Sequence, residues 1–132
     1  MSNTPSISAA EWMVMQVLWR TPHLTAVEVA ESLEGQAEWH PKTVRTLLGR
    51  LVAKGALGRE KRGGALRFTP LVTEEQCVRD ESRTFLERCF AGMAQPMLAH
   101  FIKHEELTPQ DIAVLRAMLD RKMNREQEDD GR

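Results

Sequence analysis

Residues 39–57 read WHPKTVRTLLGRLVAKGAL, and they predict one amphipathic helix with its own start and stop signals. Pro41 suits the first helical turn, where a missing N–H costs nothing, and Gly55 suits the left-handed residue that ends a helix. Trp39 and Val44 stand at the positions of a hydrophobic staple around the start. One apolar stripe recurs at i, i+3, i+4, i+7 and i+8 and predicts the buried side: Val44, Leu47, Leu48, Leu51 and Val52.

The opposite side of this helix carries cations, hydroxyls and small residues. At about 100° per residue, the positions facing away from the apolar stripe are Lys42, Thr46, Gly49, Arg50 and Ala53, with Thr43 and Arg45 on its two shoulders. Lys, Arg and Thr side chains can donate to phosphates and to base edges. The helix alone fits two interpretations equally, a DNA-reading surface or an ordinary solvated face.

A basic hairpin is predicted directly after this helix. Gly63 and Gly64 lie between two short runs, and adjacent glycines favour a two-residue turn because both positions need a positive φ. The arms and tip of the hairpin are basic, with Arg59, Lys61, Arg62 and Arg67. A helix followed by a basic hairpin is the order found in winged-helix domains.

The charge of the chain is unevenly distributed. Its formal net charge is −1 and its pI is about 6.4, which alone would not suggest a nucleic-acid partner. Residues 36–67, however, hold eight Lys and Arg against two Glu, a local charge of +6, which leaves −7 for the rest. A basic patch on an acidic body indicates a DNA-binding face joined to a domain with another task.

Two further helices are predicted upstream. Capping boxes at Ser8–Glu11 and Thr25–Glu28 open them, and residues 21–23 break the chain between them. The apolar positions of the first include Trp12 and Trp19, and the second ends at Gly35. We interpret the tryptophans, Trp39 included, as core residues rather than base-stacking platforms.

The second half predicts three helices. Residue 73 caps a helix that runs to about Phe90, a short helix follows the interruption at 91–92, and Thr108 opens the last. The expected fold is therefore mainly α with a small β-hairpin wing. It comprises an N-terminal winged helix-turn-helix domain (1–72), a C-terminal three-helix dimerisation domain (73–125) and a charged, flexible tail (126–132).

These C-terminal helices carry more apolar positions than about fifty residues can bury on themselves. They either form a dimerisation arm, which we favour, or pack back on the N-terminal domain. A dimer would place two reading helices on half-sites about 34–36 Å apart or a multiple of that. The expected dimerisation residues are Phe85, Phe90, Met97, Phe101, Ile112, Leu115 and Leu119.

Several classes of protein find no support in the sequence. No apolar run approaches the length of a membrane span, no signal peptide is recognisable, and a cytoplasmic protein is expected. Cys77 and Cys89 lie twelve residues apart in one predicted helix, about 120° around it, so they cannot form a bridge while it is intact. Phosphate loops, nucleophile elbows and CxxC motifs are missing, so we expect no enzyme and no cofactor.

His100 and His104 have a spacing compatible with a shared metal ion, which Cys89 of the neighbouring helix could join. Histidine pairs of this kind are usually surface residues, and we assign no metal site.

Three motifs now carry a family resemblance: ISAAEW (7–12), WHPKTVRTLL (39–48) and the pair Lys54-Gly55. In this order they resemble the BlaI/MecI family of penicillinase and methicillin-resistance repressors, which also includes copper-responsive members, and the likeness runs from about Ile7 to Met123. The resemblance implies a homodimeric winged-helix repressor with a helical dimerisation domain. It also implies palindromic operators with TACA/TGTA half-sites upstream of resistance or stress genes.

Three positions depart from the family pattern. His40 stands where members usually carry the Ser that caps the helix, so a weaker cap, or one that relies on backbone and water, is expected. Penicillin-responsive members are cut at an Asn-Phe bond, which corresponds here to His100 and Phe101, the candidate proteolytic switch. A membrane sensor protease is accordingly a candidate partner. The cysteine pattern of copper-responsive members is missing from residues 126–132.

We therefore expect a double-stranded DNA operator as the partner, with alternatives kept open. Thr25 is expected to place the first N–H groups of its helix on a phosphate. The alternatives are a ligand-, metal- or redox-sensing regulator, switched at an interdomain pocket or at Cys77 and Cys89, and a protein–protein adaptor without DNA, which the +6 segment disfavours. The expected DNA contacts are Lys42 near phosphates, Thr43, Arg45, Thr46 and Arg50 at bases, and Lys61 and Arg62 on the wing.

Overall fold

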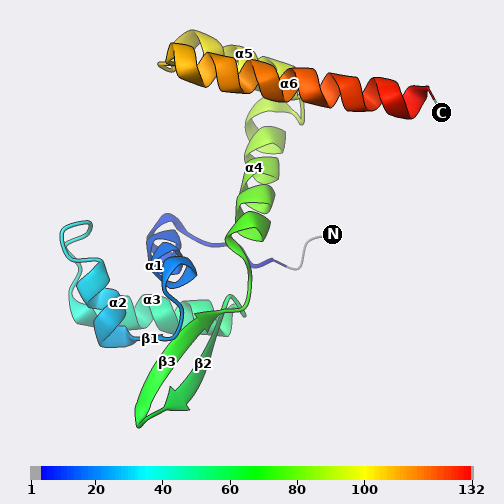
Figure 1. Cartoon of the computed structure of the whole chain (residues 1–132). Coiled ribbons are helices and arrows are strands. Elements are labelled where there is room, and N and C mark those ends of the chain that lie inside the picture. The colour runs from blue at the N-terminus through cyan, green and yellow to red at the C-terminus, as the bar shows by residue number, and fades with distance from the viewer. Residues whose placement is uncertain (1–3, 132) are drawn as a thin grey trace. The chain divides into compact units, whose positions relative to one another are not determined.

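The computed structural model describes residues 4–131 and divides the chain into two compact units, Met1–Thr84 and Phe85–Arg132. The boundary falls inside a helix, because Cys77 near the start of that helix is buried in the core of the first unit. The elements, in chain order (Figure 1), are α1 (Ala9–Arg20), β1 (Leu24–Thr25), α2 (Ala26–Ser32), α3 (Pro41–Ala53), β2 (Leu57–Arg62), β3 (Ala65–Pro70), α4 (Glu74–Phe90), α5 (Ala94–His104) and α6 (Pro109–Asp130).

The first unit is a winged helix, as the sequence predicts. Its antiparallel sheet has the order β1-β3-β2, and the β2–β3 hairpin turns at Gly63 and Gly64, whose φ angles are +59° and +79°. Strand β1 has no counterpart among the predicted elements. Its two residues pair with β3, where Leu24 lies opposite Phe68, and a strand so short has no alternating pattern to reveal it.

The predicted apolar stripe of α3 lies in the core, which confirms the phase of the helix. Leu48 is 1% and Leu51 0% exposed, while Val52 at the edge of the stripe is half-buried. The core is completed by buried residues from α1, α2, β2, β3 and α4: Val14, Met15, Leu18, Val29, Leu33, Leu57, Phe68 and Cys77.

The three tryptophans pack against this core, as expected. The rings of Trp12 and Trp19 meet edge to face at 5.5 Å, and Trp19 Nε1 donates to the carbonyl of Val72 at 2.9 Å. Trp39 packs against the same core as a half-buried residue. The indoles therefore support the domain rather than offering stacking surfaces.

The helix caps explain where the helices begin. The capping boxes predicted for α1 and α2 are present, with Ser8 and Thr25 as N-caps. For α3 the sequence suggests a weak cap, but the His40 ring provides one, because its Nδ1 accepts from the Lys42 N–H at 3.1 Å. A neutral imidazole nitrogen is a competent acceptor, and here it takes the place of a hydroxyl oxygen.

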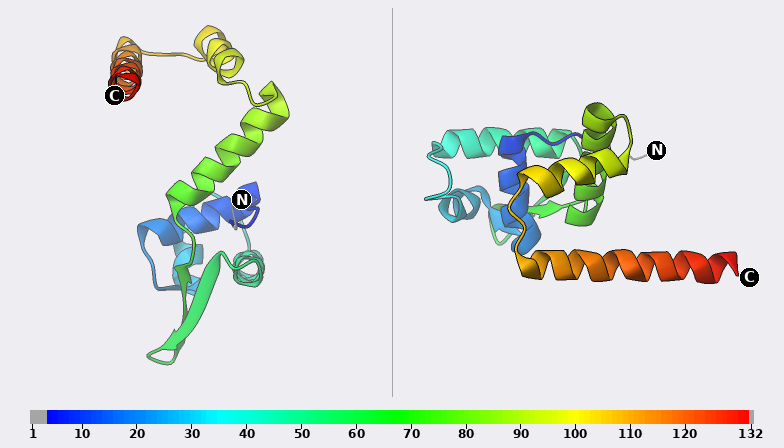
Figure 2. Two further views of the ribbon diagram at one scale, coloured as in Figure 1. Left: turned by 90° about the vertical axis from the view of Figure 1, so that its right-hand side faces the viewer. Right: turned by 90° about the horizontal axis from the view of Figure 1, so that it is seen from above.

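The second unit has no buried residue among the positions that the structure describes. Phe85 stacks on Phe101 with ring centroids 6.3 Å apart and meets Phe90 at 5.8 Å, so a small aromatic cluster joins the end of α4 to α5. Figure 2 shows α6 standing apart from α5, beyond an extended link. An apolar groove between α5 and α6 is lined by Leu98, Phe101, Ile102, Leu107, Leu115, Met118 and Leu119.

Helix α6 extends further than the sequence suggests. Residues 126–130, expected to belong to a frayed tail, are its last turns, and Gly131 forms the C-cap. Residues 126–128 are Glu, Gln and Glu, which are good helix formers, and adding residues to an existing helix avoids the cost of nucleation. Residues 126–130 therefore belong to α6 rather than to an irregular segment.

Candidate DNA-binding surface

Helix α3 presents an exposed polar face because its apolar stripe is buried on the other side. All five residues predicted to contact DNA from this helix are exposed: Lys42, Thr43, Arg45, Thr46 and Arg50. The Thr46 hydroxyl donates to the Lys42 carbonyl at 3.0 Å, one turn back. It is consequently an acceptor toward any ligand, whereas the Arg45 and Arg50 guanidinium groups offer only donors.

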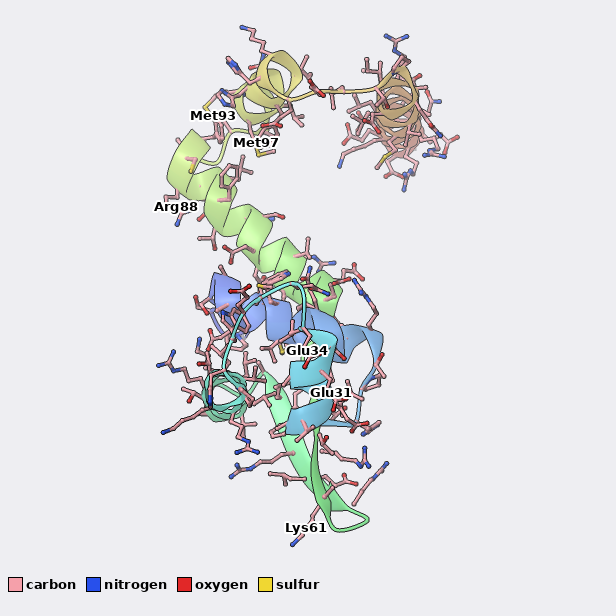
Figure 3. The ribbon with its side chains drawn as sticks, turned by 90° about the vertical axis from the view of Figure 1, so that its left-hand side faces the viewer. Glu31, Glu34, Lys61, Arg88, Met93 and Met97 are labelled. Carbon is pink, nitrogen blue, oxygen red and sulfur yellow. The ribbon has the colours of Figure 1, made fainter. Side chains whose placement is uncertain are left out.

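The strand register separates the two residues predicted for the wing. Lys61 lies opposite Leu66 and Arg59 opposite Phe68, and residues two apart share a face, so Arg59 and Lys61 occupy one face of the hairpin. Arg62 lies on the other face, where its Nε donates to Glu60. Lys61 extends from the far end of the hairpin in Figure 3. Lys61 and Arg62, both predicted as wing contacts, therefore lie on different faces of the hairpin, and Arg59 shares the face of Lys61.

Arg67 is held by internal contacts at the start of α2. Its Nη1 donates to the carbonyl of His23 at 2.9 Å and to Glu28 Oε1 at 3.3 Å. The Thr25 N–H donates to Glu28 Oε1 at 2.9 Å, and the Thr25 hydroxyl accepts from the Glu28 backbone N–H at 3.2 Å. Hydrogen bonding with Thr25, followed by the charge of Arg67, holds the pKa of the Glu28 carboxyl below its ordinary value. A carboxylate therefore lies at the helix start where the sequence suggests a phosphate.

Lys54 is also engaged inside the protein. Its Nζ donates to Glu11 Oε1 at 2.5 Å and to the carbonyl of Ser6 at 2.9 Å. Burial raises the pKa of Glu11, but the hydrogen bonds from Lys54 and Ser8 and the charge of Lys54 outweigh that effect and leave the pKa below its ordinary value. Glu11 is therefore a buried carboxylate that the ammonium group of Lys54 keeps ionised.

The eight cations of residues 36–67 thus fall into two groups. Lys54, Arg62 and Arg67 are in ion pairs with Glu11, Glu60 and Glu28. The others are exposed and form no ion pair within residues 4–131: Lys42, Arg45, Arg50, Arg59 and Lys61. These five come from α3 and from one face of the hairpin, and they define what we call the basic surface.

The predicted switch residues and Cys89 lie in the second unit, whereas Cys77 lies in the core of the first. On α5, His100 is exposed and Phe101 half-buried, and the rings of His100 and His104 are 4.5 Å apart. Among the described residues, no three His, Cys, Asp or Glu side chains gather as a metal site would require.

The two cysteines are free thiols in different surroundings. Cys77 is buried, and this burial, followed by the charge of the nearby Asp80, raises the pKa of its thiol, whereas Cys89 is exposed. None of the described helices is both long and apolar enough to cross a membrane.

Comparisons with known proteins agree with this arrangement. The penicillinase repressor of Bacillus licheniformis is 34% identical over 128 residues, which cover 97% of this chain and 100% of that protein. The methicillin resistance regulatory protein MecI of Mammaliicoccus sciuri is 32% identical over 92% of this chain and 98% of its own length. The solution structure of the DNA-binding domain of the repressor BlaI matches with a TM-score of 0.50 and 39% identity, over 58% of this chain and 93% of that one. Because the profile of the penicillinase repressor family also matches residues 7–121, the chain belongs to that family of DNA-binding transcriptional repressors.

Proposed function

We propose that this DNA-binding transcriptional repressor acts as a homodimer on a two-fold symmetric operator, with one winged helix on each half-site. The observation that carries the proposal is the basic surface: α3 buries an apolar stripe on one side and offers cations and hydroxyls on the other. A helix with this division of residues fits the major groove, where base edges present distinct patterns of donors and acceptors.

The residues divide by the kind of contact they would make. Thr43, Arg45 and Arg50 are assigned to base edges, with Thr46 as an acceptor, and Lys42 to a phosphate near the start of α3. Arg59 and Lys61 are assigned to the sugar–phosphate backbone beside the wing, where contacts fix the protein's position without reading sequence.

Arg62 and Thr25 have smaller proposed roles. Arg62 would contribute only after leaving Glu60, so its net gain from a phosphate is smaller. At the start of α2, a phosphate would have to lie beside the Glu28 carboxylate. The proposed contact at this helix start is therefore limited to a backbone N–H next to Thr25.

The second unit supports the homodimer. Its exposed apolar side chains lie mainly on α5 and α6, with Leu119 63% and Ile102 65% exposed, and a surface of this kind is seldom left in water. A second copy would cover Ile112, Leu115 and Leu119 and complete the apolar groove. The aromatic residues Phe85, Phe90 and Phe101 already pack on one another, so α6 would supply more of the interface than they do, with Met97 at its border.

Membership of the family supports the proposed setting of this function. A repressor meets its operator in the cytoplasm, and the proposed operator carries TACA/TGTA half-sites upstream of resistance or stress genes. The candidate inducing partner is a membrane sensor protease that cuts between His100 and Phe101. Because His100 replaces the Asn of the cleaved relatives, we expect the unmodified chain to resist this protease and His100→Asn to make it sensitive.

The proposal is tested by selecting duplexes from a random library with the full-length protein. The expected result is enrichment of a palindromic sequence, bound by two chains per duplex in sedimentation velocity. The triple variant Arg45→Ala/Arg50→Ala/Lys61→Ala should select nothing under the same conditions. Enrichment of asymmetric sites bound by one chain, or of no sequence at all, would contradict the proposal.

A further inference from the structure

Glu11 is buried far more deeply than its capping role requires. The side chain closes the capping box of α1, where its Oε1 accepts from the Ser8 N–H at 2.8 Å, and it is 2% exposed. The two other acidic residues in capping boxes, Glu28 of α2 and Asp111 of α6, do the same work at a half-buried and at an exposed position. Capping alone therefore does not explain why this carboxylate is in the protein interior.

The burial brings Glu11 to the end of the proposed reading helix. Lys54 is the C-cap of α3 and stands 43 residues away in sequence, yet its Nζ reaches Oε1 of Glu11. The same ammonium group donates to the carbonyl of Ser6, just ahead of α1. Two charge-assisted hydrogen bonds thus join the C-cap residue of α3 to Glu11 in the first turn of α1 and to Ser6 ahead of that helix, and such bonds are directional and strong.

This ion pair is poorly arranged for stability. Both hydrogen bonds converge on Oε1, while Oε2 is buried and accepts no hydrogen bond from any residue of the described chain. Taking the Glu11 carboxylate out of water is costly, and its partner Lys54 keeps 35% of its side chain exposed, where solvent weakens the attraction between the two charges. The geometry therefore points to a gain in orientation rather than in stability.

We propose that Lys54 and Glu11 are positioning residues for DNA recognition: their ion pair fixes the direction of the α3 axis relative to α1. The inference rests on the proposed function. Helix α3 has thirteen residues and is about 20 Å long, so a tilt of roughly 10° about its end displaces the first turn by roughly 3 Å. A displacement of that size breaks hydrogen bonds from Thr43 and Arg45 to base edges but still allows contacts with phosphates.

The decisive variant is Glu11→Gln/Lys54→Met in the full-length protein. Gln at this position keeps the capping box, and Met keeps the length of the side chain, so the pair is removed without leaving a lone buried charge. The measured quantity is the ratio of dissociation constants for a scrambled duplex and for the palindrome that the wild-type protein selects. Thermal unfolding of each variant is measured beside it.

Two control variants separate positioning from stability. Val29→Ala makes a cavity in α2 of the same unit, where Val29 is 0% exposed, and lowers stability without touching the ion pair. Lys54→Arg keeps a cation that can reach Glu11. We expect the ratio of dissociation constants to fall tenfold or more in the double variant, whose melting temperature stays close to that of the wild type. In both controls the ratio should stay within about twofold of the wild-type value.

The proposal would be overturned if the double variant kept the wild-type ratio of dissociation constants. It would also be overturned if Val29→Ala lowered that ratio as much as the double variant does. A second measurement is independent of DNA. Amide residual dipolar couplings of the free protein give the angle between α1 and α3, which should change only when the pair is removed. If the wild type selects no sequence, the proposed function fails, whereas an unchanged angle in the double variant refutes the positioning role.

Discussion

Glu11 also gives the protein an acid-sensitive element. Its pKa is held below the ordinary value of 4.5, so the unfolded chain takes up a proton more readily than the folded one. The stabilisation is therefore complete above the unfolded pKa and is lost as the pH falls through the folded value. We expect the free energy of unfolding in urea to decrease from about pH 5 downward, and Glu11→Gln to flatten that decrease. Equal pH profiles for variant and wild type would show that Glu11 is not the sensitive group.

The wing allows a prediction that distinguishes neighbouring residues. Arg59→Ala and Lys61→Ala should weaken binding to all duplexes alike and flatten the dependence of log K on log salt by roughly 0.9 for each phosphate that is no longer neutralised. Arg62→Ala should weaken binding and flatten the salt dependence less than these two variants, because Arg62 forms an ion pair with Glu60 in the free protein. The measurement is fluorescence anisotropy over a salt series with selected and scrambled duplexes. A larger effect at Arg62 than at Arg59 would mean that the hairpin faces DNA with its other side.

Single residues mark the limit of prediction from the sequence. The cationic character of residues 36–67 is plain from the sequence, but which cations are free is not, because the partners of Lys54 and Arg67 lie 43 and 39 residues away. The His40 cap escapes prediction for another reason. Propensities describe hydroxyl and carboxamide caps well, whereas an imidazole nitrogen serves only when the ring adopts one particular orientation.

At the scale of elements, α3 separates folding from recognition. Leu48 is 1% exposed, so Leu48→Ala should lower the free energy of unfolding by about 2–5 kcal/mol while leaving the sequence preference of the folded fraction unchanged. Arg50 is exposed, and Arg50→Ala should leave the melting temperature near the wild-type value and cost about 1–3 kcal/mol of discrimination at particular base pairs. Thermal unfolding measures the stability of each variant, and competition with single-base variants of the selected duplex measures its discrimination between base pairs. A stable Leu48→Ala protein would contradict the helix phase.

The elements that the sequence predicts correctly are those whose signals are local. The hairpin follows from Gly63 and Gly64, and α3 from its stripe and Pro41. Strand β1 depends instead on pairing with distant β3, and its two residues carry no period. Helix α6 runs past residue 126, where the sequence predicts the tail to begin, because Glu126, Gln127 and Glu128 are good helix formers although a run of charges suggests fraying.

At the scale of the molecule, the two units differ in what holds them together. The first has a closed core that includes Cys77 of α4, whereas residues 85–131 contain no buried side chain. The sequence predicts surplus apolar residues in the second half, and the exposed apolar faces of α5 and α6 agree with that expectation. The boundary between the two units inside α4 cannot be predicted from the sequence pattern, because nothing in the helix sequence distinguishes the buried Cys77 from the exposed Val78 that follows it.

This difference predicts what happens when the chain is shortened. A chain that ends at Thr84 keeps the whole first core, so it should fold and remain monomeric in sedimentation velocity. Joining two binding modules raises affinity by about 10²–10⁴, so the shortened chain should bind the palindrome weaker by a factor in that range and a single half-site about as well as before. Leu115→Glu/Leu119→Glu in the full chain is the matched control, since it places charges on α6 and leaves every proposed DNA contact intact. If either protein binds the palindrome as tightly as the wild type, the paired binding proposed for the dimer is wrong, and the apolar faces of α5 and α6 must serve another partner.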